Sequence, residues 1–293
     1  YRGSAVVATN AGWGGGTVDM TDTTDCGGTN ADGILEACYT LVEGAIDTTG
    51  VNAAVIAEDD AGNVSATVGD TSDATVDNIL PVVTVGQISV TGASGTGGVF
   101  KSGDIPTLYW DSIGNTDVLD SVSFDASDFR AGDTAQPGLP GGEGVFSGSL
   151  SGDIDSQEEI GNNIAVTVVD NAGNEVSLLG TNNYTIDTEV PTGTVNVDLD
   201  MVSIANAAMI VTVVYDEEMD PLSTPTINFT GSTNFSSTGP GGWSEHNTTW
   251  TQEFVHNLTP EEVAGVTAES SDATDVAGNP EGAAKASAAV RQQ

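Results

Sequence analysis

The sequence predicts an all-β protein made of antiparallel β-sandwiches in tandem. A short phrase, Asp-x-Ala-Gly-Asn, recurs three times at domain-sized intervals. Apolar residues alternate along short segments, and clusters of Gly, Asp and Asn separate these segments. The 37 Gly among 293 residues indicate many turns. Sustained helical periodicity is absent from the sequence, so strands and turns account for the pattern.

The recurring phrase is typical of a hairpin loop. Each copy lies between two apolar runs, as in "IAVTVVDNAGNEVSLL", where Ile164, Val166 and Val168 share one face before the loop and Val176 and Leu178 resume the alternation after it. We expect the glycines to adopt positive φ and the aspartates to bind backbone N–H groups two residues on. The glycines are Gly62, Gly173 and Gly278, and the aspartates are Asp59, Asp170 and Asp275.

Two segments of the form Asp-x-x-x-Pro mark the boundaries between domains. These segments, Asp77–Pro81 and Asp187–Pro191, are called joints below. Proline cannot donate to a β-ladder and suits the start of an edge strand. The joints predict three immunoglobulin-sized segments, 1–78, 79–188 and 189–293. The first is short by one or two strands, so it is either trimmed or completed by a strand of another chain.

The third segment has features of its own. A strand at "MIVTVVY" is followed by an acidic corner containing Asp216, Glu217, Glu218 and Asp220, and another strand holds Ile227 and Phe229. In "TWTQEFVH", Trp250, Gln252, Phe254 and His256 alternate on one strand face. The stretch Thr259–Glu262 forms a capping box with Pro260 at the first helical position, which predicts one short helical turn.

The charge excludes several classes of partner. The chain has 43 Asp and Glu against 5 Lys and Arg, a formal net charge of −38. Nucleic acid and anionic membrane surfaces both require clustered basic residues, so neither is an expected partner. Like charges at this density destabilise the compact state unless salt or bound cations screen them. A salty or divalent-rich medium outside the cell suits this composition.

Cys26 and Cys38 lie close together in a stretch rich in Gly, Asp and Thr. A buried thiol pair and half of a zinc site are the alternatives to a disulfide, but His246 and His256 are far away in the third segment. We therefore predict a disulfide, which implies an oxidising compartment.

The ends of the chain suggest a piece of a longer protein. The sequence begins with Tyr1 rather than Met, and its start does not resemble a signal peptide. No apolar run approaches the roughly 20 residues of a membrane helix. We expect a mature or trimmed segment that does not itself insert into a membrane.

These motifs resemble a known family. The stretch "VTVVDNAGNEVS…YTIDTEVPTGTV" resembles the F–G hairpin and interdomain joint of bacterial and archaeal immunoglobulin-like repeats, found in surface-layer proteins and large adhesins. The stretch "VVYDEEMDPLSTPTINFTG…TDVAGNPEG" is similar to a variant common in surface-layer proteins. The resemblance covers the second and third segments and the last third of the first. It implies tandem immunoglobulin-like β-sandwiches at a cell surface.

Acidic loops near the joints are candidate Ca2+ ligands, since Ca2+ takes six to eight oxygens and adjacent repeats can supply them. Solvated acidic turns are the alternative for most of these carboxylates. The candidate ligands are Asp59, Asp60, Asp170, Asp187, Asp216, Glu218, Asp220 and Asp275.

Asn-x-Ser/Thr sequons occur six times, four of them in the third segment. Chance is the alternative explanation, because Asn, Ser and Thr are all abundant. Asn63 lies in a tight turn and Asn257 precedes the predicted cap, so both are poor acceptors. The predicted N-glycosylation sites are Asn183, Asn228, Asn234 and Asn247.

Nothing in the sequence favours catalysis. A Ser–His–Asp triad requires His246 or His256, and His256 shares a predicted strand face with Trp250 and Phe254. Paired carboxylates of glycosidase type are available in any acidic protein, but an aromatic-lined cleft is not evident. Trp243 and Trp250 are either a sugar platform or ordinary packing, and packing is the expected role.

We therefore predict a non-enzymatic extracellular structural protein, a segment of a self-assembling surface-layer lattice with a cation-attracting surface. Its expected partners are identical subunits, cations and N-linked glycans. The alternatives are an adhesin stalk or binding module, a filament completed by strand exchange, and an appendage of an extracellular hydrolase.

Overall fold

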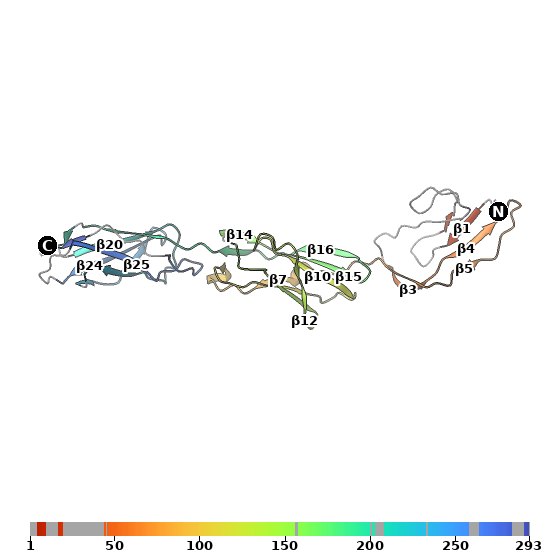
Figure 1. Ribbon diagram of the computed structural model, residues 1–293, viewed down its shortest axis with the longest axis horizontal. Coiled ribbons are helices and arrows are strands. Elements are labelled where there is room, and N and C mark those ends of the chain that lie inside the picture. The colour runs from red at the N-terminus through yellow and green to blue at the C-terminus, as the bar shows by residue number, and fades with distance from the viewer. Residues whose placement is uncertain are drawn as a thin grey trace. The chain divides into compact units, whose positions relative to one another are not determined.

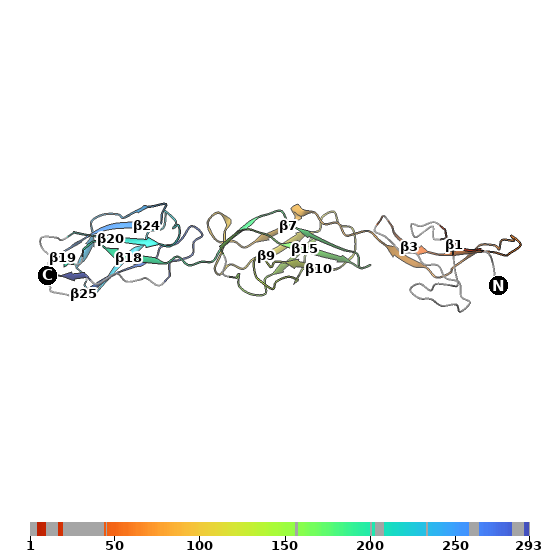
Figure 2. The same cartoon turned by 90° about the horizontal axis from the view of Figure 1, so that it is seen from above.

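The computed structural model describes residues 5–9, 17–19, 44, 46–155, 158–199, 201–202, 208–232, 234–257, 264–282 and 290–292. Within these ranges every regular element is a β-strand, apart from two short 3-10 helices, η2 (Val85–Gln87) and η3 (Thr96–Gly98) (Figures 1 and 2). The all-β prediction is confirmed. The helical turn predicted at Thr259–Glu262 lies outside the described residues.

The chain divides into two compact units. The first comprises residues 1–83, 112–122 and 167–178, and the second comprises residues 84–111, 123–166 and 179–293. This division does not test the three predicted segments, and their boundaries at 78 and 188 stay a prediction.

Residues 189–293 contain two facing sheets. The first sheet has the order β18-β20-β24-β22, with β23 also paired to β24, and the second has the order β19-β26-β25-β21. Their strands are β18 (Gly193–Val197), β19 (Met201–Val202), β20 (Ala208–Tyr215), β21 (Thr226–Thr230), β22 (Phe235–Ser237), β23 (Gly242–Ser244), β24 (Thr249–His256), β25 (Ala264–Ser271) and β26 (Val290–Gln292).

The strand order is that of an immunoglobulin-like sandwich. Lettered along the chain, the first sheet reads A-B-E-D and the second reads A′-G-F-C, which is the division of strands that defines this fold. β19 pairs with β26 in parallel, whereas the other pairings in these two sheets are antiparallel. The fold assignment for this segment therefore follows from its own connectivity.

Alternation along β20 builds the core of this sandwich. Met209, Val211 and Val213 are fully buried, whereas Ile210 is 42% exposed and Val214 is 43% exposed. The opposite sheet contributes the buried Val266 and Ala268 of β25 to the same core. Trp250, Phe254 and His256 of β24 are buried as their predicted common face requires.

Residues 79–188 show a related strand order. One sheet reads β12-β13-β9-β7, a second reads β11-β10-β15-β16, and a small third sheet reads β14-β17-β8. Lettered in the same way, the first two sheets correspond to D-E-B-A and C′-C-F-G. The strands are β7 (Ile88–Thr91), β8 (Phe100–Lys101), β9 (Thr107–Asp111), β10 (Leu119–Asp125), β11 (Gln136–Pro137), β12 (Leu139–Gly142), β13 (Val145–Ser149), β14 (Glu158–Asn162), β15 (Ala165–Asp170), β16 (Glu175–Leu179) and β17 (Tyr184–Asp187).

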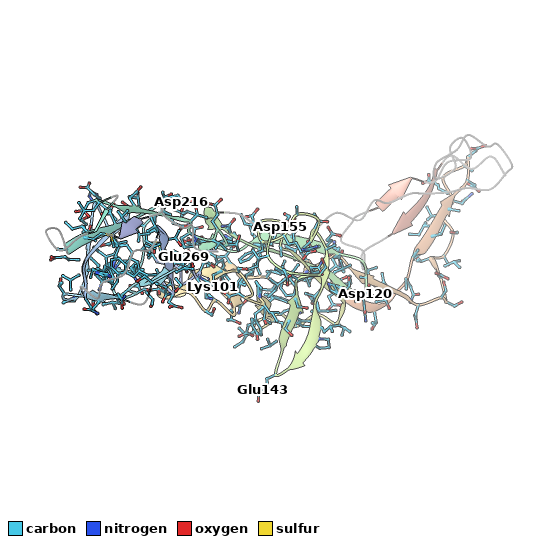
Figure 3. All side chains as sticks on the ribbon, turned by 60° about the vertical axis from the view of Figure 1, so that its left-hand side comes forward. Lys101, Asp120, Glu143, Asp155, Asp216 and Glu269 are labelled. Carbon is cyan, nitrogen blue, oxygen red and sulfur yellow. The ribbon has the colours of Figure 1, made fainter. Side chains whose placement is uncertain are left out.

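Large side chains fill the core of this sandwich. Trp110, Phe124 and Phe129 have no exposed surface. Phe100 packs edge-on against Phe129, with ring centroids 5.2 Å apart. The β12–β13 hairpin extends beyond this core, and Glu143 lies at its tip (Figure 3).

Residues 1–78 contribute two small sheets, β2-β1-β4-β5 and β3-β6. Their strands are β1 (Ala5–Thr9), β2 (Thr17–Asp19), β3 (Asp47–Val51), β4 (Ala54–Glu58), β5 (Val68–Gly69) and β6 (Ala74–Asp77). The prediction that this segment is incomplete or completed by another chain is not tested by these strands.

We expect Met209→Ala to destabilise the protein by about 2–5 kcal/mol, because it leaves a cavity in a fully packed core. Ile210→Ala, on the exposed face of the same strand, is the matched control and should cost less than about 1 kcal/mol. Denaturant unfolding followed by tryptophan fluorescence measures both changes. Equal losses for the two variants would contradict the assigned faces of β20.

Candidate functional site

The three Asp-x-Ala-Gly-Asn loops fold in the same way. In each loop the aspartate N–H donates to the asparagine carbonyl, and the glycine N–H donates to the aspartate carbonyl, at 2.9–3.2 Å. Gly62, Gly173 and Gly278 adopt φ values of 85°, 91° and 93°, as predicted. The phrase recurs because one turn geometry recurs.

The aspartate carboxylate closes each loop. Asp59 accepts the backbone N–H groups of Ala61 and Asn63 at 2.9 and 2.8 Å, and the Asn63 side-chain amide at 2.8 Å. Asp170 repeats this pattern with Ala172 and Asn174. The predicted bond two residues on is confirmed in these two loops.

In the third loop the first backbone donor lies one residue further along the chain. Asp275 Oδ1 accepts the N–H groups of Gly278 and Asn279, three and four residues on, at 2.6 and 2.8 Å. The Asn279 side-chain amide still donates to Asp275 Oδ2 at 2.9 Å. The pairing of the loop aspartate with the loop asparagine is therefore common to all three.

Hydrogen bonds favour the ionised form of two loop aspartates. The side-chain amide of Asn63 is the largest influence that lowers the pKa of Asp59. At Asp170 burial raises the pKa, but the side-chain and backbone donors of Asn174 and Ala172 outweigh it, so the net pKa is lowered. The hydrogen bonds therefore favour the ionised form of both carboxylates, which accepts these bonds.

The second amide proton of two loop asparagines reaches a joint. Asn174 Nδ2 donates to the Asp77 carbonyl at 3.2 Å, within the first unit. Asn279 Nδ2 donates to the Asp187 carbonyl at 3.0 Å, within the second unit. The acceptor is the last residue of a strand each time, β6 and β17. One asparagine therefore ties its own loop to the joint some ninety residues earlier in the chain.

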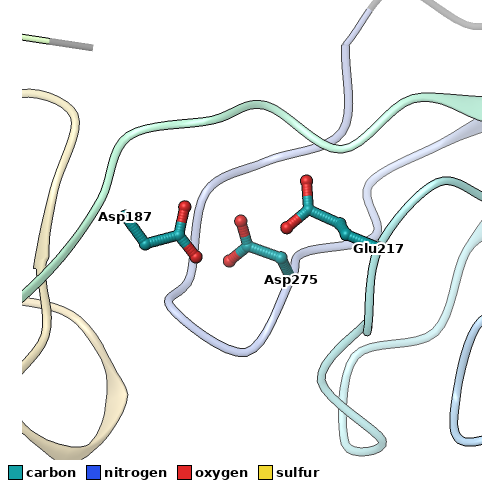
Figure 4. Close-up of side chains that lie close together, drawn as sticks. All are labelled: Asp187, Glu217 and Asp275. Carbon is teal, nitrogen blue, oxygen red and sulfur yellow. The ribbon is translucent and has the colours of Figure 1, made fainter. Parts of the chain in front are cut away.

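Three carboxylates meet at the second joint. Asp187, Glu217 and Asp275 each present an oxygen within 4.8 Å of the others (Figure 4). Asp275 is 1% exposed, whereas Asp187 and Glu217 are half-buried. Carboxylate oxygens are the ligands that Ca2+ prefers. This group could hold a cation, and it is the only one of its kind among the residues that the structure describes.

Carboxylates also face one another at the first joint. The pKa of Asp117 is raised by burial and by the charges of Asp77, Asp170 and Asp47. All four belong to the first unit. Asp77 and Asp170 occupy the same motif positions as Asp187 and Asp275. Both joints therefore concentrate negative charge beside the asparagine bond.

Other predicted cation ligands have different contacts. Asp216 accepts the backbone N–H and the hydroxyl of Thr192, the former at 2.7 Å. Glu218 accepts the Asn247 side-chain amide at 3.2 Å, and Asp220 accepts the N–H of Leu222 at 2.9 Å. Asp60, the second residue of the first loop, is exposed. The structure brings none of these four into the group formed by Asp187 and Asp275.

Glu217 was absent from the predicted ligands, although it lies in the acidic corner. A signal for it was present in the sequence. The alternation of β20 buries Val211, Val213 and Tyr215, and it continues through the half-buried Glu217 to the buried Met219. Asp216 and Glu218 lie at the alternate positions, which correspond to the other face of the strand, and are exposed. Extending the period of the strand into the corner would have selected Glu217.

The predicted glycosylation sites differ in accessibility. Asn183 and Asn228 are exposed, whereas Asn234 and Asn247 are half-buried. Asn247 also donates to Glu218 and has a φ of 61°. Glycosylation at any of the four stays a prediction. Cys26 and Cys38 lie outside the described residues, so the predicted disulfide is not tested.

The aromatic and histidine candidates have packing roles. Trp243 and Trp250 meet edge to face at 5.2 Å, and Trp243 donates to the Ser223 carbonyl. His256 is 7% exposed and packs edge-on against Phe235. The expected packing of Trp243 and Trp250 is what the structure shows.

No family model and no curated protein matches the sequence. Among solved structures, the chain is similar to a tetra-tandem repeat in the extending region of a large adhesion protein, with a TM-score of 0.29 and 19% identity over 99% of this chain. It spans 66% of the length of that structure.

It is also similar to the D00-D0 domain of intimin, with a TM-score of 0.29 and 15% identity over 70% of this chain and 99% of that one. Both TM-scores are low, so the immunoglobulin-like assignment depends on the strand orders above. The part of the chain that the structure describes holds no helix of the length and apolarity needed to cross a membrane.

We expect Asp170→Asn to destabilise the protein by about 1–3 kcal/mol at pH 7, because asparagine cannot accept all three loop donors and leaves a buried group unpaired. The folded-state pKa of Asp170 is lowered, so its contribution is complete above the unfolded pKa of about 4. The contribution is lost as the pH falls through the folded pKa.

Thermal melts of wild type and variant from pH 7 down to about pH 2 measure this difference. It should shrink as the pH falls. Asp59→Asn, in the exposed copy of the loop, is the matched control and should have the smaller effect at pH 7. A difference that grows in acid would rule out the carboxylate as its source.

Proposed function

We propose that this chain is a non-enzymatic extracellular spacer, a tandem immunoglobulin-like segment of an adhesin-type stalk. The observation that supports this most directly is the repeated bond from a loop asparagine to the preceding joint, at Asn174 and again at Asn279. A stalk has to hold each repeat in a fixed orientation relative to the next. A bond that recurs at each joint does this with groups that every repeat can supply.

The surface charge supports an extracellular setting. Lys101, Arg130 and Arg291 are the basic residues in the described ranges, and Arg130 lies 3.9 Å from Asp133 and 3.7 Å from Asp155. The remaining carboxylates greatly outnumber them. Dense uncompensated charge keeps a chain hydrated and separated from its neighbours, which suits a spacer in a salty medium.

We further propose that the second joint binds Ca2+. Asp187, Glu217 and Asp275 supply hard oxygen ligands, and the Asp187 carbonyl lies beside them in the Asn279 bond. These residues fit a cation of this kind, since its charge offsets the repulsion among three carboxylates. The bound ion would join residues distant in the chain and so stiffen the joint.

The surface-layer lattice predicted from the sequence is the weaker candidate. The repeated asparagine bonds support order along one chain, which a tandem stalk needs, whereas a lattice needs contacts between chains in addition. Self-assembly with identical subunits, glycan attachment and strand completion by a second chain stay predictions.

We expect calcium to raise the melting temperature and chelation at matched ionic strength to lower it. A ligand that binds only the folded state stabilises by about 2.7 kcal/mol at a hundredfold excess over its Kd. Glu217→Gln should weaken this response. Glu253→Gln, an exposed position on β24, is the control and should preserve it. Identical melts with calcium and with chelator would identify these acids as solvated turns.

We expect the purified chain in calcium to remain single in sedimentation and negative-stain electron microscopy. In a stalk the repeats are held in order within one chain, and the net charge of −38 opposes association between chains. Two-dimensional sheets under these conditions would overturn the stalk in favour of a surface-layer lattice. Filaments would favour strand exchange through residues 1–78.

A further inference from the structure

The first Asp-x-Ala-Gly-Asn loop lacks the contact that the other two make. Asn63 donates one amide hydrogen to Asp59, as Asn174 and Asn279 do to Asp170 and Asp275. A side-chain amide has two such hydrogens. In the later loops the second one reaches a joint carbonyl. Among the residues that the structure describes, Asn63 has no corresponding acceptor.

Burial shows the same difference. Asn279 is 1% exposed, and the loop aspartates Asp170 and Asp275 are 2% and 1% exposed. In the first loop, Asn63 is exposed and Asp59 is only half-buried. Val64, which follows Asn63, is 61% exposed. The turn is thus covered most fully at Asp275–Asn279, in part at Asp170–Asn174, where Asn174 is half-buried, and least at Asp59–Asn63.

The covering element in the later loops has a defined chemistry. It is the end of a β-strand, β6 or β17, whose last residue is an aspartate that presents its carbonyl and is followed by Pro four residues on. Residues 1–58 contain no proline, so they hold no segment of this form. The element that fits the first loop therefore comes from another repeat.

We propose that the loop Asp59–Asn63 is a docking site for the Asp-x-x-x-Pro strand end of another immunoglobulin-like repeat. The second hydrogen of the Asn63 amide binds the carbonyl of the incoming aspartate, and the strand end covers Asp59 and Val64. This inference extends the proposed spacer function by naming the partner of its first repeat. The docking proposal depends on the loop geometry and is tested independently of calcium binding.

The proposed acceptor on the incoming strand end is a main-chain carbonyl, which a side-chain substitution does not remove. The residue to substitute is therefore the donor, Asn63. A peptide copying Tyr184–Thr192, which contains Asp187 and Pro191, is the probe. It is titrated into the isotope-labelled full-length chain at about 0.15 M salt, where screening limits repulsion between carboxylates to about 8 Å. Amide spectra and hydrogen exchange are recorded for all three loops.

We expect saturable shifts at the backbone amides of 61–63 and at the Asn63 side-chain amide. The loops at 172–174 and 277–279 should not respond, because their asparagines already bind a joint. Asn63→Ala should weaken binding about threefold or more, the equivalent of one hydrogen bond. Asn174→Ala, the matched control in an occupied loop, should leave peptide binding at 61–63 unchanged.

Hydrogen exchange gives an independent test without the peptide. The amides of 61–63 should exchange faster than those of 172–174 and 277–279, and the peptide should slow only the first set. Equal protection of all three loops in the free chain would overturn the proposal, since the first loop would already be covered. Shifts that persist unchanged in Asn63→Ala, or that fail to saturate, would overturn it as well.

Failure of this docking leaves the spacer function standing if the chain remains single and calcium stabilises it. Conversely, two-dimensional sheets with intact peptide binding would reject the spacer and keep the docking site. A response of 61–63 to calcium alone, with none to the peptide, would assign the loop to cations and reject docking.

Discussion

The two hydrogens of one side-chain amide connect local and long-range structure in this chain. One closes the loop by binding the loop aspartate, and the other binds the carbonyl at the end of a strand some ninety residues earlier. Neither serine nor aspartate could replace asparagine, because neither has two donors on one atom. The rest of each joint is arranged around this bond, including the carboxylates that it brings together.

That arrangement has an electrostatic cost. Asp170 and Asp117 lie in the same unit, yet the pKa of one is lowered and that of the other is raised. Asp170 receives three hydrogen bonds, whereas Asp117 is partly buried and faces other carboxylates. Carboxylates supplied with donors stabilise the loops, and those without them repel. A cation at Asp187, Glu217 and Asp275 would offset the corresponding repulsion at the second joint.

Much of the fold was predictable because it depends on local rules. Alternation identified the buried faces of β15 and β24, and Gly at the fourth loop position anticipated a positive φ. The candidate cation group was predicted only in part. Asp187 and Asp275 were expected, but Asp216, Glu218 and Asp220 bind Thr192, Asn247 and Leu222 instead. Their roles depend on which residues lie opposite the corner, and spacing along the chain does not contain that information.

The sequence by itself determined the strands, the turns, the excess of negative charge and the recurrence of one loop, since each depends on residues a few positions apart. Only the tertiary structure decided that Asn174 reaches Asp77, that Asn279 reaches Asp187, and that Glu217 joins the acidic group. These contacts join segments brought together by sheet packing. The same loop sequence is therefore buried at Asp170 and Asp275 and open at Asn63, because burial depends on what covers a loop and not on how it turns.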